Sequence, residues 1–230
     1  MSVLVKICGL MRPSDCEAAV EAGADFVGVV FAESRRQQTR QSAIEILASM
    51  PKRTGRRLRR PPKALSVVEW YRHRARQVEA LFEKRRTLVV GVFDGVNPGL
   101  VMAYADTIGL DLAQIGPNDP WDDAHYIGIP VIKAIQGSTT SFDAIEKEPS
   151  ICLLDGDRPG SGEAFDWRPA TALAAEMPIM LAGGLTADNV GEAVRTVQPW
   201  AVDVSSGVEV DGRKDPELMK RFVAAAKGSS

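Results

Sequence analysis

Eight short apolar runs, separated by stretches with helical periodicity, constrain the fold of this chain more than any other feature. The runs are rich in Val, Ile and Leu and are nearly continuous, which is typical of strands buried on both faces of a parallel sheet. They comprise Val3–Cys8, Phe26–Phe31, Leu88–Phe93, Leu112–Ile115, Val131–Ile135, Ile151–Asp155, Ile179–Ala182 and Ala201–Ser205. Eight strands that alternate with helices predict an α/β fold, the closed (β/α)₈ or TIM barrel.

The stretches between these runs carry helical periodicity, and several of them have helix start signals. Ser14, Thr186 and Asp215 each stand where a helix N-cap is expected. The expected helices include Ser14–Ala22, Pro98–Thr107, Ala187–Thr196 and Pro216–Ala226. The chain of 230 residues has the length of one such barrel, so we predict a single domain that spans residues 1–230.

One basic segment interrupts the alternation between the second helix and the third strand. Residues 52–86 hold thirteen Lys and Arg against three Asp and Glu, and they include most of a breaker-rich stretch at 51–63. A helix-like stretch, Ala64–Arg86, follows it. We predict an insertion with an extra helix. Two roles stay open for this segment, which are a dock for an acidic partner and a solvated surface excursion.

Charge and composition argue against several other classes of protein. The net charge of −2 gives no sign of a nucleic-acid or membrane partner, and no apolar run reaches the ~20 residues that span a bilayer. The first residues do not read as a signal peptide. Cys8, Cys16 and Cys152 show neither metal-ligand spacing nor a disulfide framework. We therefore expect a cytoplasmic protein without a metal. Its oligomeric state stays open between monomer and homodimer.

In a (β/α)₈ barrel, catalytic and binding groups come from the carboxyl ends of the strands. The last two expected strands lead into glycine-bearing turns, at the position where such barrels bind phosphate. Glycine lets the backbone approach an anion closely, and free N–H groups then donate to it. We expect a phosphate site there, to which the loop with Gly160 and Gly162 adds donors or a lid. The residues of the two turns are Gly183, Gly184, Ser205, Ser206 and Gly207.

Two further strand ends present a thiol and a carboxyl group. Cys8 ends the first strand before Gly9, and Asp155 ends the sixth. A thiolate can remove a proton when nearby cations such as Lys6 or Arg36 lower the pKa of the thiol, and a desolvated carboxyl group can supply one. A pair of this kind suits acid–base isomerisation. The alternative is a buried thiol that serves only as a small hydrophobic side chain.

Blocks along most of the chain resemble the phosphoribosylanthranilate isomerases, enzymes of tryptophan biosynthesis. The combination of KICG near the start with the later GGL and VDVSSGVE blocks is specific. The similar blocks are VKICGL at 5–10, EAGADFVGVVFAESRR at 21–36, VVGVF at 89–93, LLD with GSG and FDW at 153–167, LAGGLTADNV at 181–190 and AVDVSSGVE at 201–209.

This resemblance implies a fold, a reaction and a role for each residue. The fold is a (β/α)₈ barrel, and the reaction is the Amadori rearrangement of N-(5-phosphoribosyl)anthranilate to the corresponding 1-deoxyribulose 5-phosphate. The resemblance implies Cys8 as general base and Asp155 as general acid. It places Arg36 against the substrate carboxylate, Asp203 at the barrel mouth and the glycine-bearing turns around the phosphate. It implies neither a metal nor an organic cofactor.

Departures from the family pattern leave alternatives open. After the fourth strand the family usually has Gln-Leu-His-Gly, and this chain has Gln-Ile-Gly-Pro at 114–117; Glu163 and Ala164 also differ. A related isomerase of histidine biosynthesis, or an enzyme that acts on both substrates, is one alternative. Cys8 argues against it, because that family has an aspartate at each of the two strand ends. A non-catalytic barrel that binds through its basic segment is the other, and the acid–base pair and phosphate site argue against it.

Overall fold

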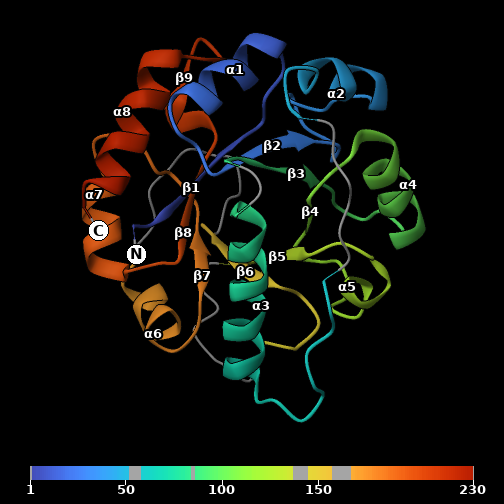
Figure 1. Ribbon diagram of the computed structural model, residues 1–230. Helices are drawn as coiled ribbons and strands as arrows, with labels where there is room; N and C mark the ends of the chain where they lie inside the picture. The colour runs from blue at the N-terminus through green and yellow to red at the C-terminus, as the bar shows by residue number, and fades with distance from the viewer. Residues whose placement is uncertain (1, 52–57, 84–85, 137–144, 157–166, 230) are drawn as a thin grey trace.

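The computed structural model describes residues 2–51, 58–83, 86–136, 145–156 and 167–229. Eight strands pair in sequence order, each parallel to the next, and the first pairs with the last to close a barrel (Figure 1). The predicted (β/α)₈ fold is confirmed. The strands are β1 (Leu4–Cys8), β2 (Phe26–Val30), β3 (Leu88–Val92), β4 (Leu112–Ile115), β5 (Val131–Gln136), β6 (Ile151–Asp155), β7 (Ile179–Leu181) and β8 (Ala201–Val204).

Helices surround the barrel on the outside, and a short hairpin follows β8. None of the described helices is both long and apolar enough to cross a bilayer. The helices are α1 (Pro13–Glu21), α2 (Arg40–Ile46), α3 (Val67–Phe82), α4 (Pro98–Ile108), α5 (Asp123–Tyr126), α6 (Arg168–Glu176), α7 (Val190–Val197) and α8 (Pro216–Lys227). The hairpin consists of a 3₁₀ turn, η2 (Ser206–Val208), and the two short strands β9 (Glu209–Val210) and β10 (Arg213–Lys214).

Local sequence explains where the helices begin. Asp215 caps α8 as predicted, because its side chain accepts a hydrogen bond from Leu218 N at 2.9 Å. The predicted caps Ser14 and Thr186 are wrong. Pro13 takes the first helical position of α1, which moves the cap one residue before it, and α7 begins only after Asn189, at Val190.

The buried strand residues divide into two clusters, as alternation of side chains across a closed sheet requires. One cluster includes Val27, Val29 and Val89, together with apolar side chains of the surrounding helices. The other joins strand residues with Ala75 and Val78 of α3. The strand residues in this second cluster include Phe26, Leu88, Leu112, Ile132, Ile151, Met180 and Ala201, most of them at or near the start of a strand.

Helix α3 lies across the amino-terminal end of the barrel, where it appears in front of the ring of strands in Figure 1. Trp70 Nε1 donates to Pro149 O at 2.9 Å, just before β6, and Trp200 Nε1 donates to Glu79 at 2.7 Å, just before β8. The ring of Phe82 packs edge-on against the ring of Phe26, with 5.3 Å between the two ring centroids. Residues 67–82 of the basic segment therefore form a helix that covers this end of the core.

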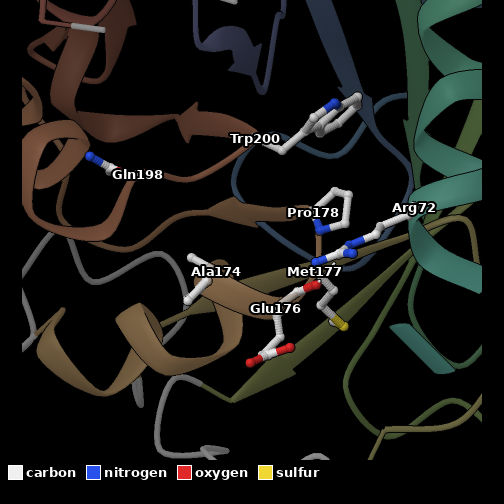
Figure 2. Close-up of a pocket in the computed structure, with 8 residues that line it drawn as sticks. Arg72, Ala174, Glu176, Met177, Pro178, Gln198 and Trp200 are labelled. Carbon is white, nitrogen blue, oxygen red and sulfur yellow. Dashed lines mark hydrogen bonds between the residues drawn. The ribbon is translucent and has the colours of Figure 1, made fainter. Parts of the chain in front are cut away.

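A hollow of about 250 Å³ lies at this same end, beside α3 and α6 (Figure 2). Arg72 reaches it from α3 and donates to the carbonyl oxygen of Glu176 at 3.1 Å. Pro178 and Trp200, which stand just before β7 and β8, form part of its wall. The hollow therefore lies at the amino-terminal end of the strands, whereas the predicted catalytic residues Cys8 and Asp155 stand at the carboxyl ends.

Candidate active site

The carboxyl ends of β1, β6 and β8 bring four ionisable side chains into one electrostatic neighbourhood. Cys8 ends β1 and Asp155 ends β6, while Lys6 and Asp203 face each other in the register between β1 and β8. The charge of Asp203 acts on both Cys8 and Asp155, and so does the charge of Lys6. The predicted pair is therefore linked through a buried lysine and a buried aspartate.

Lys6 and Asp203 form a buried ion pair between the first and the last strand. Lys6 Nζ lies 2.8 Å from Asp203 Oδ2, and Lys6 is wholly buried. Burial alone would lower the pKa of Lys6, but the neighbouring Asp203 and Cys8 outweigh it and raise the pKa. The other carboxylate oxygen, Asp203 Oδ1, is buried and has no partner among the described residues, so it can accept a hydrogen bond from a ligand.

Cys8 is buried, and a glycine on the next strand makes room for its thiol. A Cβ atom on Gly28, its register partner, would lie only 2.8 Å from Cys8 Sγ. Burial raises the pKa of Cys8, while the cations of Lys6 and Lys214 act against this rise. The environment therefore holds a proton on the thiol in the free protein and provides cations that stabilise the thiolate once it forms.

Asp155 keeps its proton to a higher pH than an ordinary aspartate does. Burial, with the negative charge of Asp203 as a second cause, raises the pKa of Asp155 to about 6. A hydrogen bond from Gly156 N to Asp155 Oδ1 at 2.9 Å opposes this rise. A carboxyl group with such a pKa is able to donate a proton near neutral pH.

The turns after β7 and β8 lie against each other at the mouth. Gly183 and Gly184 have φ angles of 88° and 61°, which favour glycine, and their backbone amides donate no hydrogen bond within the described part of the chain. A Cβ atom on Gly207 would lie 1.9 Å from Leu185 O, so the second turn packs directly on the first. Ser205 Oγ donates to Cys8 O at 3.1 Å and joins these turns to the end of β1.

Arg36 lies against Gly9, just after β1, and a carboxylate holds its guanidinium group. Its Cδ atom would be 2.5 Å from a Cβ atom on Gly9, and its guanidinium group donates twice to Glu209, at 2.7 and 3.0 Å. Lys214 Nζ donates to the same carboxylate at 2.8 Å and to Ser205 O at 2.7 Å. Burial would raise the pKa of Glu209, but bonds from Arg36 and Lys214 lower it to about 2.

The wall after β4 is built without the histidine that the family usually has there. Asp119 accepts hydrogen bonds from Gly95 N and Gly116 N, each at 2.8 Å, and so joins the loops after β3 and β4. Buried Lys133 of β5 donates to the carbonyl oxygens of Gly116, Pro117 and Asp119. This lysine therefore braces the loop through carbonyl groups.

The structure thus brings Cys8, Asp155 and Asp203 to one mouth, with Arg36 and the two glycine-bearing turns at its edge. Gly160 and Gly162 lie outside the described residues. Lys6 was predicted only as a cation near the thiol of Cys8, and Gly28, Glu209 and Lys214 had no predicted role. Glu209 stands inside the AVDVSSGVE block, which was the available signal for it. In the described ranges, no group of three or more His, Cys, Asp or Glu residues is arranged to hold a metal ion.

Residues 48–225 match the family model described as N-(5'phosphoribosyl)anthranilate (PRA) isomerase. The N-(5'-phosphoribosyl)anthranilate isomerase of Dehalococcoides mccartyi is 32% identical over 98% of this chain and 96% of its own length. The enzyme of the same name from Streptococcus mutans is 34% identical over 97% and 98%. A multifunctional tryptophan biosynthesis protein of Phycomyces blakesleeanus is 39% identical over 98% of this chain, which spans only 33% of that protein.

Solved structures give the same result. The phosphoribosylanthranilate isomerase of Thermotoga maritima superimposes with a TM-score of 0.75 at 30% identity, over 98% of this chain and 99% of that one. A phosphoribosylanthranilate isomerase in complex with reduced 1-(o-carboxyphenylamino)-1-deoxyribulose 5-phosphate superimposes with a TM-score of 0.71 at 29% identity, over the same shares.

Proposed function

The chain belongs to the N-(5'-phosphoribosyl)anthranilate isomerase family, and from this premise we propose that Cys8 and Asp155 carry out its reaction as general base and general acid. The protein is an isomerase of tryptophan biosynthesis and acts on a small phosphorylated substrate. The observation that supports the two roles best is the placement of a thiol and of a carboxyl group with a raised pKa at the ends of β1 and β6, where both interact with the ion pair of Lys6 and Asp203.

The reaction needs one proton delivered and one removed. Asp155 protonates the ribose ring oxygen, the bond between that oxygen and C1 breaks, and a protonated Schiff base forms with the anthranilate nitrogen. Cys8 as thiolate removes the proton from C2, and the electrons of that bond move to give an enolamine. The enolamine tautomerises to the ketone product. The rearrangement involves no net oxidation or reduction and needs no cofactor.

The surrounding groups recognise the two charged ends of the substrate. Gly183, Gly184, Ser205, Ser206 and Gly207 surround the phosphate with backbone amides and hydroxyl groups. Gly160 and Gly162, outside the described residues, stay predicted phosphate-loop residues. Arg36 binds the anthranilate carboxylate. The free Oδ1 atom of Asp203 accepts a hydrogen bond from the ribose part of the substrate.

The whole chain, residues 1–230, acts as one unit in this proposal. It works in the cytoplasm, as the three free cysteines favour, and as a monomer or a homodimer. Within segment 52–86, helix α3 contributes to the fold by covering the core. No metal, nucleic acid or membrane takes part, and these absences stay predictions.

A turnover assay with two single variants tests the roles. Cys8→Ser and Asp155→Asn should each lower kcat by about 10²-fold or more, which is the usual contribution of a positioned acid or base. The assay follows the loss of substrate fluorescence. Cys152→Ser and Asp188→Asn are matched controls, because Cys152 is a buried thiol away from the mouth and Asp188 is an exposed carboxylate. If both site variants kept wild-type kcat, the assignment would be wrong.

A second substrate tests the specificity. The aminoaldose phosphate of histidine biosynthesis should give no substantial turnover, because a carboxylate is expected in place of Cys8 for that reaction. Comparable kcat/KM values on both substrates would show an enzyme that serves both pathways.

A further inference from the structure

Three cations from two distant parts of the chain converge on one carboxylate beside the mouth. The side chain of Glu209 is only 3% exposed, and it accepts hydrogen bonds from Arg35, Arg36 and Lys214. The arginines precede this carboxylate by 174 and 173 residues, whereas the lysine follows it by 5. A buried acid that collects three cations leaves an excess of positive charge at this place, which suits an anionic ligand.

The geometry of the Arg36 pair leaves one edge of its guanidinium group free for a ligand. Nε donates to Oε1 of Glu209 at 2.7 Å, and Nη2 donates to Oε2 at 3.0 Å. This bidentate pairing uses two of the five N–H groups. The three that remain include the pair on Nη1 and Nη2 that can hold a second carboxylate in the same bidentate manner. Glu209 thus fixes the plane of the group without occupying the edge that a substrate needs.

The same carboxylate is connected to the turn after β8 through a second cation. Lys214 has a side chain exposed by 0%, and its Nζ atom joins Glu209 to the carbonyl oxygen of Ser205. Ser205 in turn donates to Cys8 O. Asp211 and Gly212 have φ angles of 49° and 74° and form the tight turn that places Glu209 and Lys214 side by side on β9 and β10.

We propose that Glu209 is a positioning residue that holds Arg36 in the orientation needed for the substrate carboxylate and couples it, through Lys214, to the phosphate turn after β8. The inference rests on the proposed function, in which Arg36 binds that carboxylate. Glu209 touches neither the reacting atoms nor the substrate. It sets the distance between the two anionic ends that the site accepts, and so it contributes to binding more than to proton transfer.

The test compares Glu209→Gln with wild type on two substrates. An amide has the shape of the carboxylate, but its nitrogen donates where an acceptor is needed, so Arg36 loses its fixed plane. The KM for N-(5-phosphoribosyl)anthranilate should rise about 10-fold or more while kcat stays within about 3-fold, which is the pattern of lost uniform binding. The carboxylate-free analogue N-(5-phosphoribosyl)aniline should show nearly the same KM in both proteins. Glu217→Gln is the control, because that carboxylate forms an exposed ion pair on α8.

A binding titration makes the result independent of turnover. Reduced 1-(o-carboxyphenylamino)-1-deoxyribulose 5-phosphate should bind Glu209→Gln about 10-fold more weakly than wild type, and the loss should disappear in an Arg36→Ala background. Wild-type turnover with no change of KM or Kd in Glu209→Gln would overturn this inference and leave the proposed function intact. If Glu209→Gln bound the ligand more weakly but the wild type did not turn over the substrate, the inference would stand and the proposed function would be wrong.

Folding is checked by circular dichroism, and Glu209→Asp replaces the first variant if it fails to fold. The shorter carboxylate keeps the charge but cannot reach Arg36 and Lys214 together. It should raise KM and Kd in the same direction by a smaller factor. A folded Glu209→Asp protein with wild-type KM and Kd would also overturn the inference.

Discussion

A carboxyl group with a raised pKa destabilises the folded chain whenever it is ionised, and Asp155 is such a group. Its pKa is about 6 in the folded protein and near 4 in an unfolded chain, so the folded state binds the proton more tightly. The free energy of unfolding therefore falls as pH rises from about 4 to about 6 and stays lower above that range. The residue proposed as catalytic acid thus lowers stability at the pH at which it works.

Asp155→Asn should remove this penalty. We expect the variant to be more stable than wild type by about 2–3 kcal/mol at pH 8, from a pKa shift of about two units. The gain should vanish near pH 4, where the carboxyl group is protonated in both states. Urea unfolding at the two pH values measures it, with exposed Asp188→Asn as the control. Equal stability of Asp155→Asn and wild type at pH 8 would contradict the raised pKa.

Gly28 gives a second prediction at the level of one residue. Alanine there would place a Cβ atom 2.8 Å from Cys8 Sγ, so the thiol must move away from its position at the mouth. We expect Gly28→Ala to lower kcat by about 10²-fold, since misplacing a reacting group by about 1 Å has that effect. Steady-state kinetics on the purified protein measures the change.

Gly91→Ala is the matched control on the neighbouring strand. Its Cβ atom would meet Leu110 at 2.5 Å and Phe93 at 2.8 Å, which are apolar side chains outside the mouth. This variant should lose stability and keep kcat. If Gly28→Ala lost stability and kept kcat as well, the glycine would serve packing alone.

Among the elements, α3 contributes to stability at the end of the barrel opposite the chemistry. Trp70 is 2% exposed and Tyr71 is wholly buried, and both bond to backbone carbonyl groups that precede β6. We expect Trp70→Ala to lower the free energy of unfolding by about 3–5 kcal/mol, which is typical for a buried aromatic residue. The KM and kcat of the folded variant should equal those of wild type. Urea unfolding and kinetics on one preparation test both statements.

Arg76→Ala provides the comparison on the same helix. Arg76 is exposed, so its removal should change the free energy of unfolding by no more than about 0.5 kcal/mol. A change in KM on mutating Trp70 would mean that the two ends of the barrel communicate.

The elements also show what the sequence could and could not predict. Both ends of every strand were predictable to within one residue, because a strand buried on both faces has to be apolar throughout. The position of α3 was not, because periodicity identifies an apolar face but not the surface that covers it. The contacts of Glu209 were not predictable either, since its arginine partners lie 174 and 173 residues away and only the closed barrel brings them together.

For the whole molecule, the pairing of β1 with β8 is the contact that closes the ring. Lys6 and Asp203 stand opposite each other in that register and form a buried ion pair. Lys6→Met should lower the free energy of unfolding by about 3–5 kcal/mol, because Asp203 is left buried and unpaired. Adding Asp203→Asn should restore much of the loss. Urea unfolding at pH 8 distinguishes these cases, and a double variant no more stable than Lys6→Met alone would argue against a charge effect.

The register between the first and the last strand also determines when the barrel can close during synthesis of the chain. Lys6 leaves the ribosome before Asp203, its partner in the ion pair, which is made 197 residues later. Until then the lysine must remain in water, because burial without its carboxylate is too unfavourable. A nascent chain that still lacks its last strand can therefore neither close the ring nor recognise an anionic sugar. A message with a premature stop codon before that strand would yield a polypeptide without activity, however much of the barrel it encoded.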